Sequence, residues 1–254
     1  MKNDRSARFL LCLPLLAGLT LSLWAVEVRK TKKYTEWTES EVGQILSHSP
    51  WVNTEAVRAD ISVSNDVPSS KVPAGVRAGR QPDQNTSGNS KDLWSCSAGN
   101  VGSSRQPEQD TSTLSYTVMW YSATPVRQAI ARRASLRNLA TEEQLKQFLQ
   151  PVGDVCLIAV SGDIQQLLMQ ANQADVLKRT YLQVRGKDKI FATNFKSPSS
   201  ASLPAIYEFP RNIQGAPIFT ENDKDVVFSS DLGTIRIESC FIPKKMIFED
   251  KLVF

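Results

Sequence analysis

Histidine is nearly absent from this sequence, and cysteine is rare. His48 is the only histidine among 254 residues, and beyond an apolar N-terminal run the only cysteines are Cys96, Cys156 and Cys240. Because no C-x-x-C or H-x-x-x-H pair occurs, the sequence predicts no zinc site. The three cysteines are widely spaced and leave any disulfide pairing open. We expect Cys156 and Cys240 to be small buried residues in strands.

One histidine leaves one candidate general base for a serine or cysteine nucleophile. Ser47 and Ser49 flank His48, but we expect immediate neighbours at a helix end to point away from each other. The G-x-S-x-G motif of many serine hydrolases is also missing. The sequence therefore predicts no catalytic residue, although a hydrolase with an unrecognised site stays open as an alternative.

Motifs for phosphate binding and for glycosidase chemistry are missing as well. The glycines at 99–102 are not followed by the G-K-[ST] of a phosphate loop. Two acid pairs, Glu142–Glu143 and Asp223–Asp225, are explained by exposed helix caps or turns. We therefore predict a protein that is not an enzyme and that needs no cofactor or metal.

A strong excess of one charge is lacking too. The formal net charge is +4, and removing residues 1–26 leaves 27 basic against 25 acidic residues. Nucleic-acid-binding proteins carry a clustered basic face, and this sequence shows none. We expect no nucleic-acid partner.

The sequence has one long apolar run, Phe9–Val26, which follows a short basic start. This layout is typical of a signal peptide, and eighteen apolar residues also reach the lower limit for a membrane-spanning helix. Basic residues follow the run closely, at Arg29, Lys30, Lys32 and Lys33. They oppose translocation, so cleavage and anchoring both remain open. We predict that 1–26 is a signal peptide or membrane anchor and that the protein is periplasmic or extracellular, possibly anchored to the inner membrane.

Residues 27–61 are predicted to contain a short amphipathic helix. Thr38 and Glu41 have the spacing of a capping box, and Pro50 ends the helical pattern. The apolar side chains of this segment are Trp37, Val42, Ile45 and Trp51. They can pack on the protein's own core or bind a partner protein, and most amphipathic helices are packed on their own protein.

Residues 62–113 are rich in serine, asparagine, glutamine, glycine and proline. Such a segment cannot bury enough apolar surface to offset the entropy of ordering, so we predict a long disordered insertion.

Residues 114–254 return to regular patterns. Strands are expected at 116–122, 155–160, 181–185, 190–195, 205–209, 226–230, 234–241, 246–248 and 252–254. Helices are expected after Thr124 and Thr141 and over 164–178. The pattern predicts an α+β domain: an antiparallel sheet or sandwich with helices inserted after its first two strands.

The helix that follows Thr124 is rich in arginine, with Thr124 as its expected cap. Its basic residues are Arg127, Arg132, Arg133 and Arg137. They form either a solvated face or a binding surface for anionic lipid or a cell-wall polymer.

Four stretches resemble a family of exported bacterial proteins of unknown function: WTESEVGQILSHSPWV, VMWYSATPVRQAIARR, IYEFPR and IRIESCFIPKKMIFEDKLVF. The family pattern is W-T-E-x-E-V-x-x-I-L-x-x-S-P-W, then W-x-S-A-x-P-V-R-x-A, an F-P-R strand and a closing K-x-M-x-F/Y-x-x-K-L hairpin. This chain departs from it by its serine-rich insertion and by ending in Val253-Phe254. The resemblance implies a location in the cell envelope and no catalytic residue.

We therefore expect a non-enzymatic exported envelope protein that serves as a protein-interaction or assembly module. Its partner would be another envelope protein, and an uncleaved N-terminal segment would add contact with the membrane. Binding of an anionic lipid or cell-wall polymer through the arginine-rich helix is the alternative.

Overall fold

The computed structural model of the protein describes residues 32–59 and 112–254. The predicted signal or anchor segment, 1–26, lies outside the described residues, as do residues 62–111 of the predicted disordered insertion. The last two residues of that insertion are described and belong to a strand, so the predicted boundary at 113 is too late. In the two described stretches, no helix is both long enough and apolar enough to cross a membrane.

Five strands form the larger sheet, in the spatial order β1-β2-β3-β7-β6, and every neighbouring pair is antiparallel. The strands are β1 (Val52–Ala59), β2 (Ser112–Trp120), β3 (Val155–Gly162), β6 (Asn194–Lys196) and β7 (Ala205–Pro210). β1 was not predicted, because its segment was read only as the tail of the N-terminal helix region. It pairs along its whole length with β2 and so joins the residues before 60 to the main domain.

A second antiparallel sheet has the order β11-β10-β4-β5. Its strands are β4 (Thr180–Val184), β5 (Lys189–Phe191), β10 (Val226–Asp231) and β11 (Arg236–Phe241). Two small hairpins complete the strands: β8 (Asn212–Ile213) with β9 (Ala216–Pro217), and β12 (Ile247–Phe248) with β13 (Lys251–Leu252). The predicted α+β class and antiparallel pairing are confirmed.

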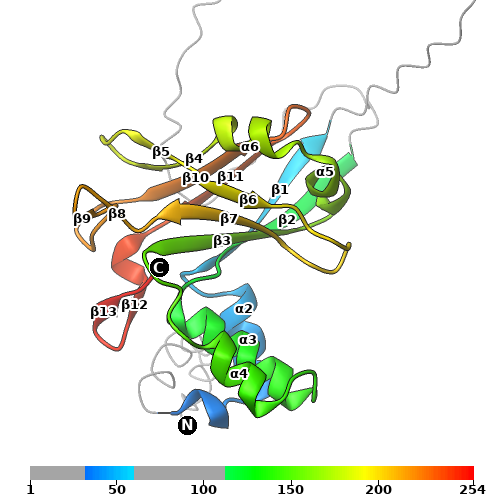
Figure 1. Cartoon of the computed structure of the whole chain (residues 1–254), viewed down its shortest axis with the longest axis vertical. Helices are drawn as coiled ribbons and strands as arrows, with labels where there is room; N and C mark the ends of the chain where they lie inside the picture. The colour runs from blue at the N-terminus through cyan, green and yellow to red at the C-terminus, as the bar shows by residue number, and fades with distance from the viewer. Residues whose placement is uncertain (1–31, 60–111) are drawn as a thin grey trace, which may run out of the picture.

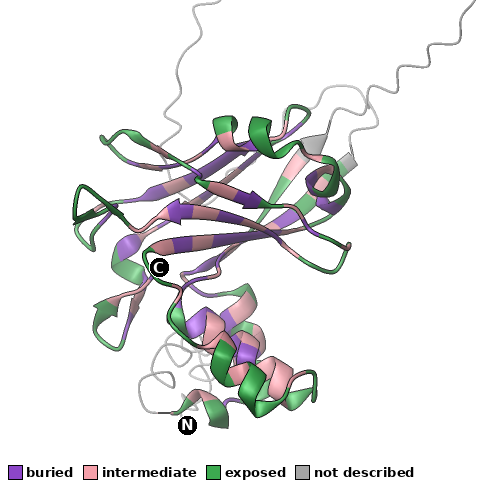
Figure 2. Cartoon of the chain, viewed as in Figure 1, coloured by how far each residue is buried: buried purple, intermediate pink, exposed green. Residues whose placement is uncertain are grey.

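The two sheets share one hydrophobic core, as the buried residues along their strands show (Figures 1 and 2). Tyr207 of β7 meets Phe228 of β10 with ring centroids 5.3 Å apart. Trp120 of β2 meets Phe241 of β11 at 5.6 Å. The alternating burial of β4 and β7 arises because successive side chains of a strand point to opposite faces.

Side chains close one corner between the sheets, where β1 and β11 meet. Asn53 donates a hydrogen bond of 2.7 Å to the main-chain oxygen of Cys240. The hydroxyl of Tyr116 donates to the main-chain oxygen of Glu238 at 3.0 Å and accepts from its N–H at 3.1 Å. These bonds occupy main-chain groups of β11 that an open edge strand would leave free.

The chain itself crosses between the sheets at another corner. The predicted hairpin strand 190–195 is in fact two strands, with β5 in the smaller sheet and β6 in the larger one. Between them, the Ala192 N–H donates to Thr180 and the Thr193 N–H donates to Glu208. The strands exposed at this side are therefore only three residues long.

Helices lie at both ends of the strands (Figure 1). One group contains η1 (Tyr34–Glu36), α2 (Glu39–Ser47), α3 (Thr124–Leu136) and α4 (Glu142–Phe148). The other contains α5 (Gln165–Gln170) and α6 (Gln173–Arg179), while η2 (Pro243–Lys245) follows β11. The single helix predicted over 164–178 is thus two helices, and the side chain of Asn172 caps the second.

The predicted helix starts have different outcomes. The capping boxes Thr38–Glu41 and Thr141–Gln144 are confirmed by hydrogen bonds in both directions. The predicted cap at Thr124 is wrong, because α3 begins at Thr124 itself and Ala123 occupies the cap position without a side-chain bond. The N-terminus of α3 is therefore left without a side-chain acceptor.

Candidate functional site: an arginine-lined cavity

The four apolar residues proposed to bind a partner are all buried in the described fold. Trp37, Val42, Ile45 and Trp51 are at most 2% exposed. The first three pack with Ala129 of α3, so that α2 docks on α3. Trp51 belongs to the sheet core, where its indole N–H donates to Val253 at 2.8 Å. These side chains form internal contacts and no exposed docking surface.

Two of the four predicted anion-binding arginines fasten α2 to α3. The Nε of Arg132 donates to the main-chain oxygen of Trp37 at 2.8 Å. Arg137 forms an ion pair with Glu39 at the start of α2. Arg133 lies beside them and is partly buried, and its Nε has no hydrogen-bond partner among the described residues. The arginines therefore do not form one continuous solvated face.

Arg127, in the first turns of α3, points to a different place. Its Nη2 donates to the main-chain oxygen of Gln150 at 2.9 Å, and its guanidinium carbon lies 4.6 Å from the ring centroid of Phe148. Burial lowers the pKa of Arg127, and Tyr121 partly offsets this effect. The side chain still carries its charge near neutral pH, since the ordinary arginine pKa is above about 12.

A cavity of about 430 Å³ opens beside Arg127. Its walls come from the start of α3, the loop between α4 and β3, and the end of β7. The lining residues are Ser122, Thr124, Arg127, Gln128, Leu149, Gln150, Pro151, Val152, Gly153 and Arg211. The size falls within the range of roughly 300–1,000 Å³ that is usual for ligand pockets.

Arg211 is the second arginine of this cavity, and it was not among the predicted site residues. Its Nη2 donates to the main-chain oxygen of Phe254, and its guanidinium carbon lies 5.0 Å from the Phe254 ring centroid. The sequence marks it only as the residue after Pro210, and nothing in the local pattern connects it with Arg127.

The strand pairing brings the two arginines to one cavity. At the junction of β2 and α3, Ser122 accepts a hydrogen bond from the Leu157 N–H at 2.9 Å and so holds the start of α3 against β3. β3 also pairs with β7, and the Arg211 N–H donates to Asp154 at 2.9 Å just beyond that pairing. Both arginines are thus positioned against the same strand.

The electrostatics of this cavity are positive. Among the described residues that line it, none is an aspartate or glutamate. In the described part of the chain, neither Arg127 nor Arg211 forms an ion pair with an aspartate or glutamate side chain. Main-chain oxygens and aromatic rings hold the two guanidinium groups, and the oxygen that Arg211 contacts belongs to Phe254, the last residue of the sequence. The uncapped N-terminus of α3 adds a partial positive charge. The arrangement suits an anionic group.

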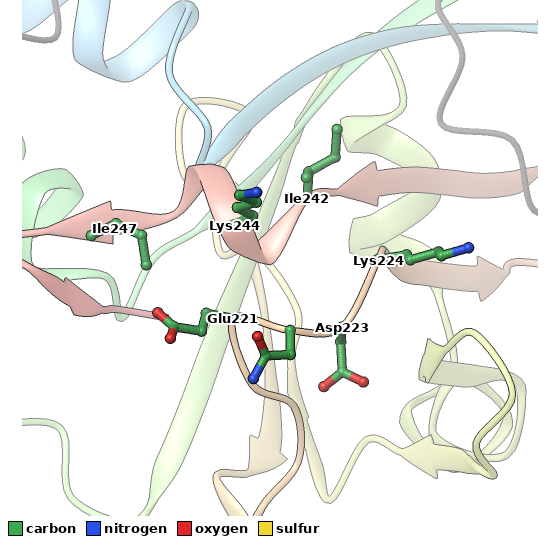
Figure 3. Close-up of a pocket in the computed structure, with 7 residues that line it drawn as sticks. Glu221, Asp223, Lys224, Ile242, Lys244 and Ile247 are labelled. Carbon is green, nitrogen blue, oxygen red and sulfur yellow. The ribbon is translucent and has the colours of Figure 1, made fainter.

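A larger cavity, of about 590 Å³, lies between the 221–224 loop and η2 (Figure 3). Acids and bases are mixed in it, and Figure 3 shows Asp223, Lys224 and Lys244 pointing in different directions. Asp223 is already paired with Lys187 at 2.9 Å and accepts from the Thr220 N–H at 2.7 Å. Because its charges are mixed and directed apart, this cavity offers no convergent set of groups for a ligand.

The acid pairs have structural roles. Asp225 is buried and bonded to Arg185, so the expectation that this pair is exposed is wrong for Asp225. Glu142 and Glu143 are exposed in the first turn of α4.

His48 and Ser47 correct another expectation. They do not point apart: the Ser47 hydroxyl and the His48 Nδ1 are 2.6 Å apart. The same hydroxyl donates to the Gly43 oxygen at 2.7 Å, so its single proton is already engaged and His48 acts as the donor to it. Both residues are exposed. This contact is a helix-end bond and does not activate the serine as a nucleophile.

The cysteines also differ from expectation in one case. Cys156 is buried in β3, as predicted, and burial raises the pKa of its thiol to about 12. Cys240 is only partly buried and forms a disulfide bond, so its interpretation as a simple buried residue is wrong. Within 32–59 and 112–254, no three His, Cys, Asp or Glu side chains gather in a way that could hold a metal ion.

The chain was compared with known protein families, proteins and structures. No protein-family model, no curated protein and no solved structure matches this chain.

Proposed function

We propose that this protein is a non-enzymatic binding module that works outside the cytoplasm and holds an anionic group in the cavity between Arg127 and Arg211. The observation that carries the proposal is the pair of arginines, which line one cavity without an aspartate or glutamate partner in the described chain. Taking a guanidinium partly out of water is costly unless it is paired. A bound carboxylate or phosphate would supply the missing charge and accept the remaining N–H groups.

The proposal moves the anion-binding surface expected on the arginine-rich helix to one end of that helix. Arg132 and Arg137 are used to hold α2, whereas Arg127 faces the cavity. Thr124, the first residue of α3, lines the same cavity. The ligand is then a single anionic group held in a pocket, which differs from a broad membrane or polymer surface.

Export is supported by two independent features. The basic start followed by the run Phe9–Val26 has the layout of a secretory signal or anchor. The disulfide at Cys240 is typical of an oxidising compartment, because cytosolic thiols are kept reduced. The natural partner of the cavity is accordingly an anionic component of the cell envelope or its surroundings.

A second candidate function is contact with another envelope protein through the turn between α3 and α4. Leu136 is 39% exposed and Leu139 is 72% exposed there. Leu139→Asp tests this candidate: it should abolish a specific band in a pull-down from intact envelopes and leave the melting temperature unchanged.

Calorimetric titration with simple anions tests the main proposal. Acetate and inorganic phosphate serve as probes, and acetamide serves as the neutral control. Arg127→Met and Arg211→Met should each weaken anion binding about tenfold or more, which is the loss of roughly 1.4 kcal/mol expected for one charge-assisted hydrogen bond. Arg137→Met is the matched control, since Arg137 is the C-cap residue of the same helix and does not line the cavity.

The outcomes are distinct. If Arg137→Met weakens binding and the two cavity variants do not, anions bind the helix surface and the cavity proposal is wrong. If none of the anions binds the wild-type protein, the proposal is also wrong. Because Arg127 and Arg211 make internal hydrogen bonds, the melting temperature of each variant is measured first, and Arg127→Lys is added as a milder change that keeps the charge.

A further inference from the structure

The α4–β3 loop gives the cavity a largely apolar wall. Leu149, Pro151 and Val152 line it together with the polar Gln150, and Gly153 near the end of the loop has a φ of +86°. This positive φ is accessible to glycine at little cost, so the chain turns sharply from the cavity wall into β3. One cavity thus combines the guanidinium groups of Arg127 and Arg211 with a short apolar wall.

Besides the arginines, Ser122, Thr124, Gln128 and Gln150 bring polar side chains to the cavity. The Ser122 hydroxyl is already used, since it accepts from the Leu157 N–H and lies 3.5 Å from the Leu157 oxygen. The lining residues within 32–59 and 112–254 include no lysine. The Nε of Arg211 is buried, so this group presents only its outer nitrogens. Aromatic rings cover one face of each guanidinium, and Nη2 of each arginine already donates to a main-chain oxygen, so a ligand would share the remaining N–H groups.

We infer that the anion is a carboxylate attached to an apolar group, an inference that rests on the proposed function of this cavity. A planar carboxylate matches the edge of a guanidinium, and both oxygens can accept from one fork. An apolar group next to it would lie along Leu149, Pro151 and Val152 and gain from leaving water. Inorganic phosphate has no group to place on that wall.

Two sources offer this chemistry: a small aliphatic acid and the C-terminal residue of a peptide with an apolar side chain. A cavity of about 430 Å³ has room for either ligand end. Hexanoate represents the first source and N-acetyl-leucine represents the second. Acetate and inorganic phosphate are the reference anions, and all four are titrated into the intact protein.

Hexanoate should bind about tenfold or more tightly than acetate, because each fully buried methylene contributes roughly fourfold and a chain on an open wall is only partly buried. Val152→Ser should remove most of this advantage and leave acetate affinity unchanged. The matched control is Val227→Ser, a partly buried valine of β10 that does not line the cavity. Preference for N-acetyl-leucine over hexanoate would support the inference and identify the peptide source; the reverse order would support it with the aliphatic source.

Failure of the inference differs from failure of the proposed function. If phosphate binds more tightly than hexanoate and Arg127→Met abolishes its binding, the cavity binds anions but the inferred ligand class is wrong. If hexanoate and acetate bind equally, the apolar wall contributes nothing and the inference is again overturned. If no anion binds at all, the proposed function fails and the inference fails with it.

Discussion

Replacing Ile45 by alanine tests whether α2 is an integral part of this protein. Ile45 is 2% exposed and packs with Trp37, Val42 and Ala129 in a cluster that joins α2 to α3. The change removes three carbon atoms, which corresponds to roughly 2.4 kcal/mol of lost transfer free energy. The cavity left behind adds to this cost, and comparable substitutions lower the free energy of unfolding by about 2–5 kcal/mol.

We therefore expect a loss of about 3 kcal/mol. In a domain of this size, each kcal/mol shifts the melting temperature by about 2–4 °C, so the expected decrease is about 6–12 °C. Thermal unfolding followed by circular dichroism or calorimetry measures it. Gln44→Ala is the matched control, because Gln44 is the exposed neighbour on the same helix and alanine suits a helix at least as well.

The reasoning would be refuted by equal melting temperatures for Ile45→Ala, Gln44→Ala and the wild-type protein. That result would mean that α2 does not dock on α3 in solution and that its apolar face is available to a partner. A short helix of nine residues is marginal alone in water, so an undocked α2 would also lose helical signal.

Three further predictions follow from individual contacts. Arg132→Ala should lower the free energy of unfolding by about 1–2 kcal/mol, because the hydrogen bond from Arg132 to Trp37 is partly buried. Arg137→Ala should lower it by less than about 1 kcal/mol, since the ion pair of Arg137 is exposed. Denaturant unfolding of both variants checks this order. In the native protein, Cys156 should resist iodoacetamide at pH 8, because it is buried and burial raises its thiol pKa to about 12; rapid labelling in mass spectrometry would contradict its placement. Burial alone would raise the pKa of Glu41, but hydrogen bonds from Thr38 and Lys32 lower this pKa below its ordinary value of 4.5. The stability that Glu41 contributes is therefore present above about pH 4.5 and is lost as the pH falls through the lowered pKa. Glu41→Gln should flatten this part of the curve of stability against pH.

The features that the sequence predicted well depend on neighbours in the chain. The Thr38–Glu41 and Thr141–Gln144 capping boxes span three residues each, so their geometry follows from local spacing. β4 and β7 alternate buried and partly buried positions, and this period of two is visible in the sequence. Local patterns therefore predicted most elements and the α+β class.

The features that were missed depend on distant contacts. β1 carries polar side chains at Asn53, Thr54 and Glu55, and only its pairing with β2 makes it a strand. Arg211 joins Arg127 because β3 pairs with β7 and also holds the start of α3, and no local pattern specifies that register. The assignment of Thr124 as a cap failed because a threonine before proline fits both the cap and the first helical position.

The most direct test of the cavity is a nuclear magnetic resonance titration that observes the arginine side chains. We predict that hexanoate shifts the Nε–H signals of Arg127 and Arg211 together, with one dissociation constant for both. The signal of Arg137 should stay in place, because Arg137 lies outside the cavity and pairs with Glu39. Shifts confined to Arg137, or no shift of Arg127 and Arg211 at millimolar hexanoate, would contradict the account.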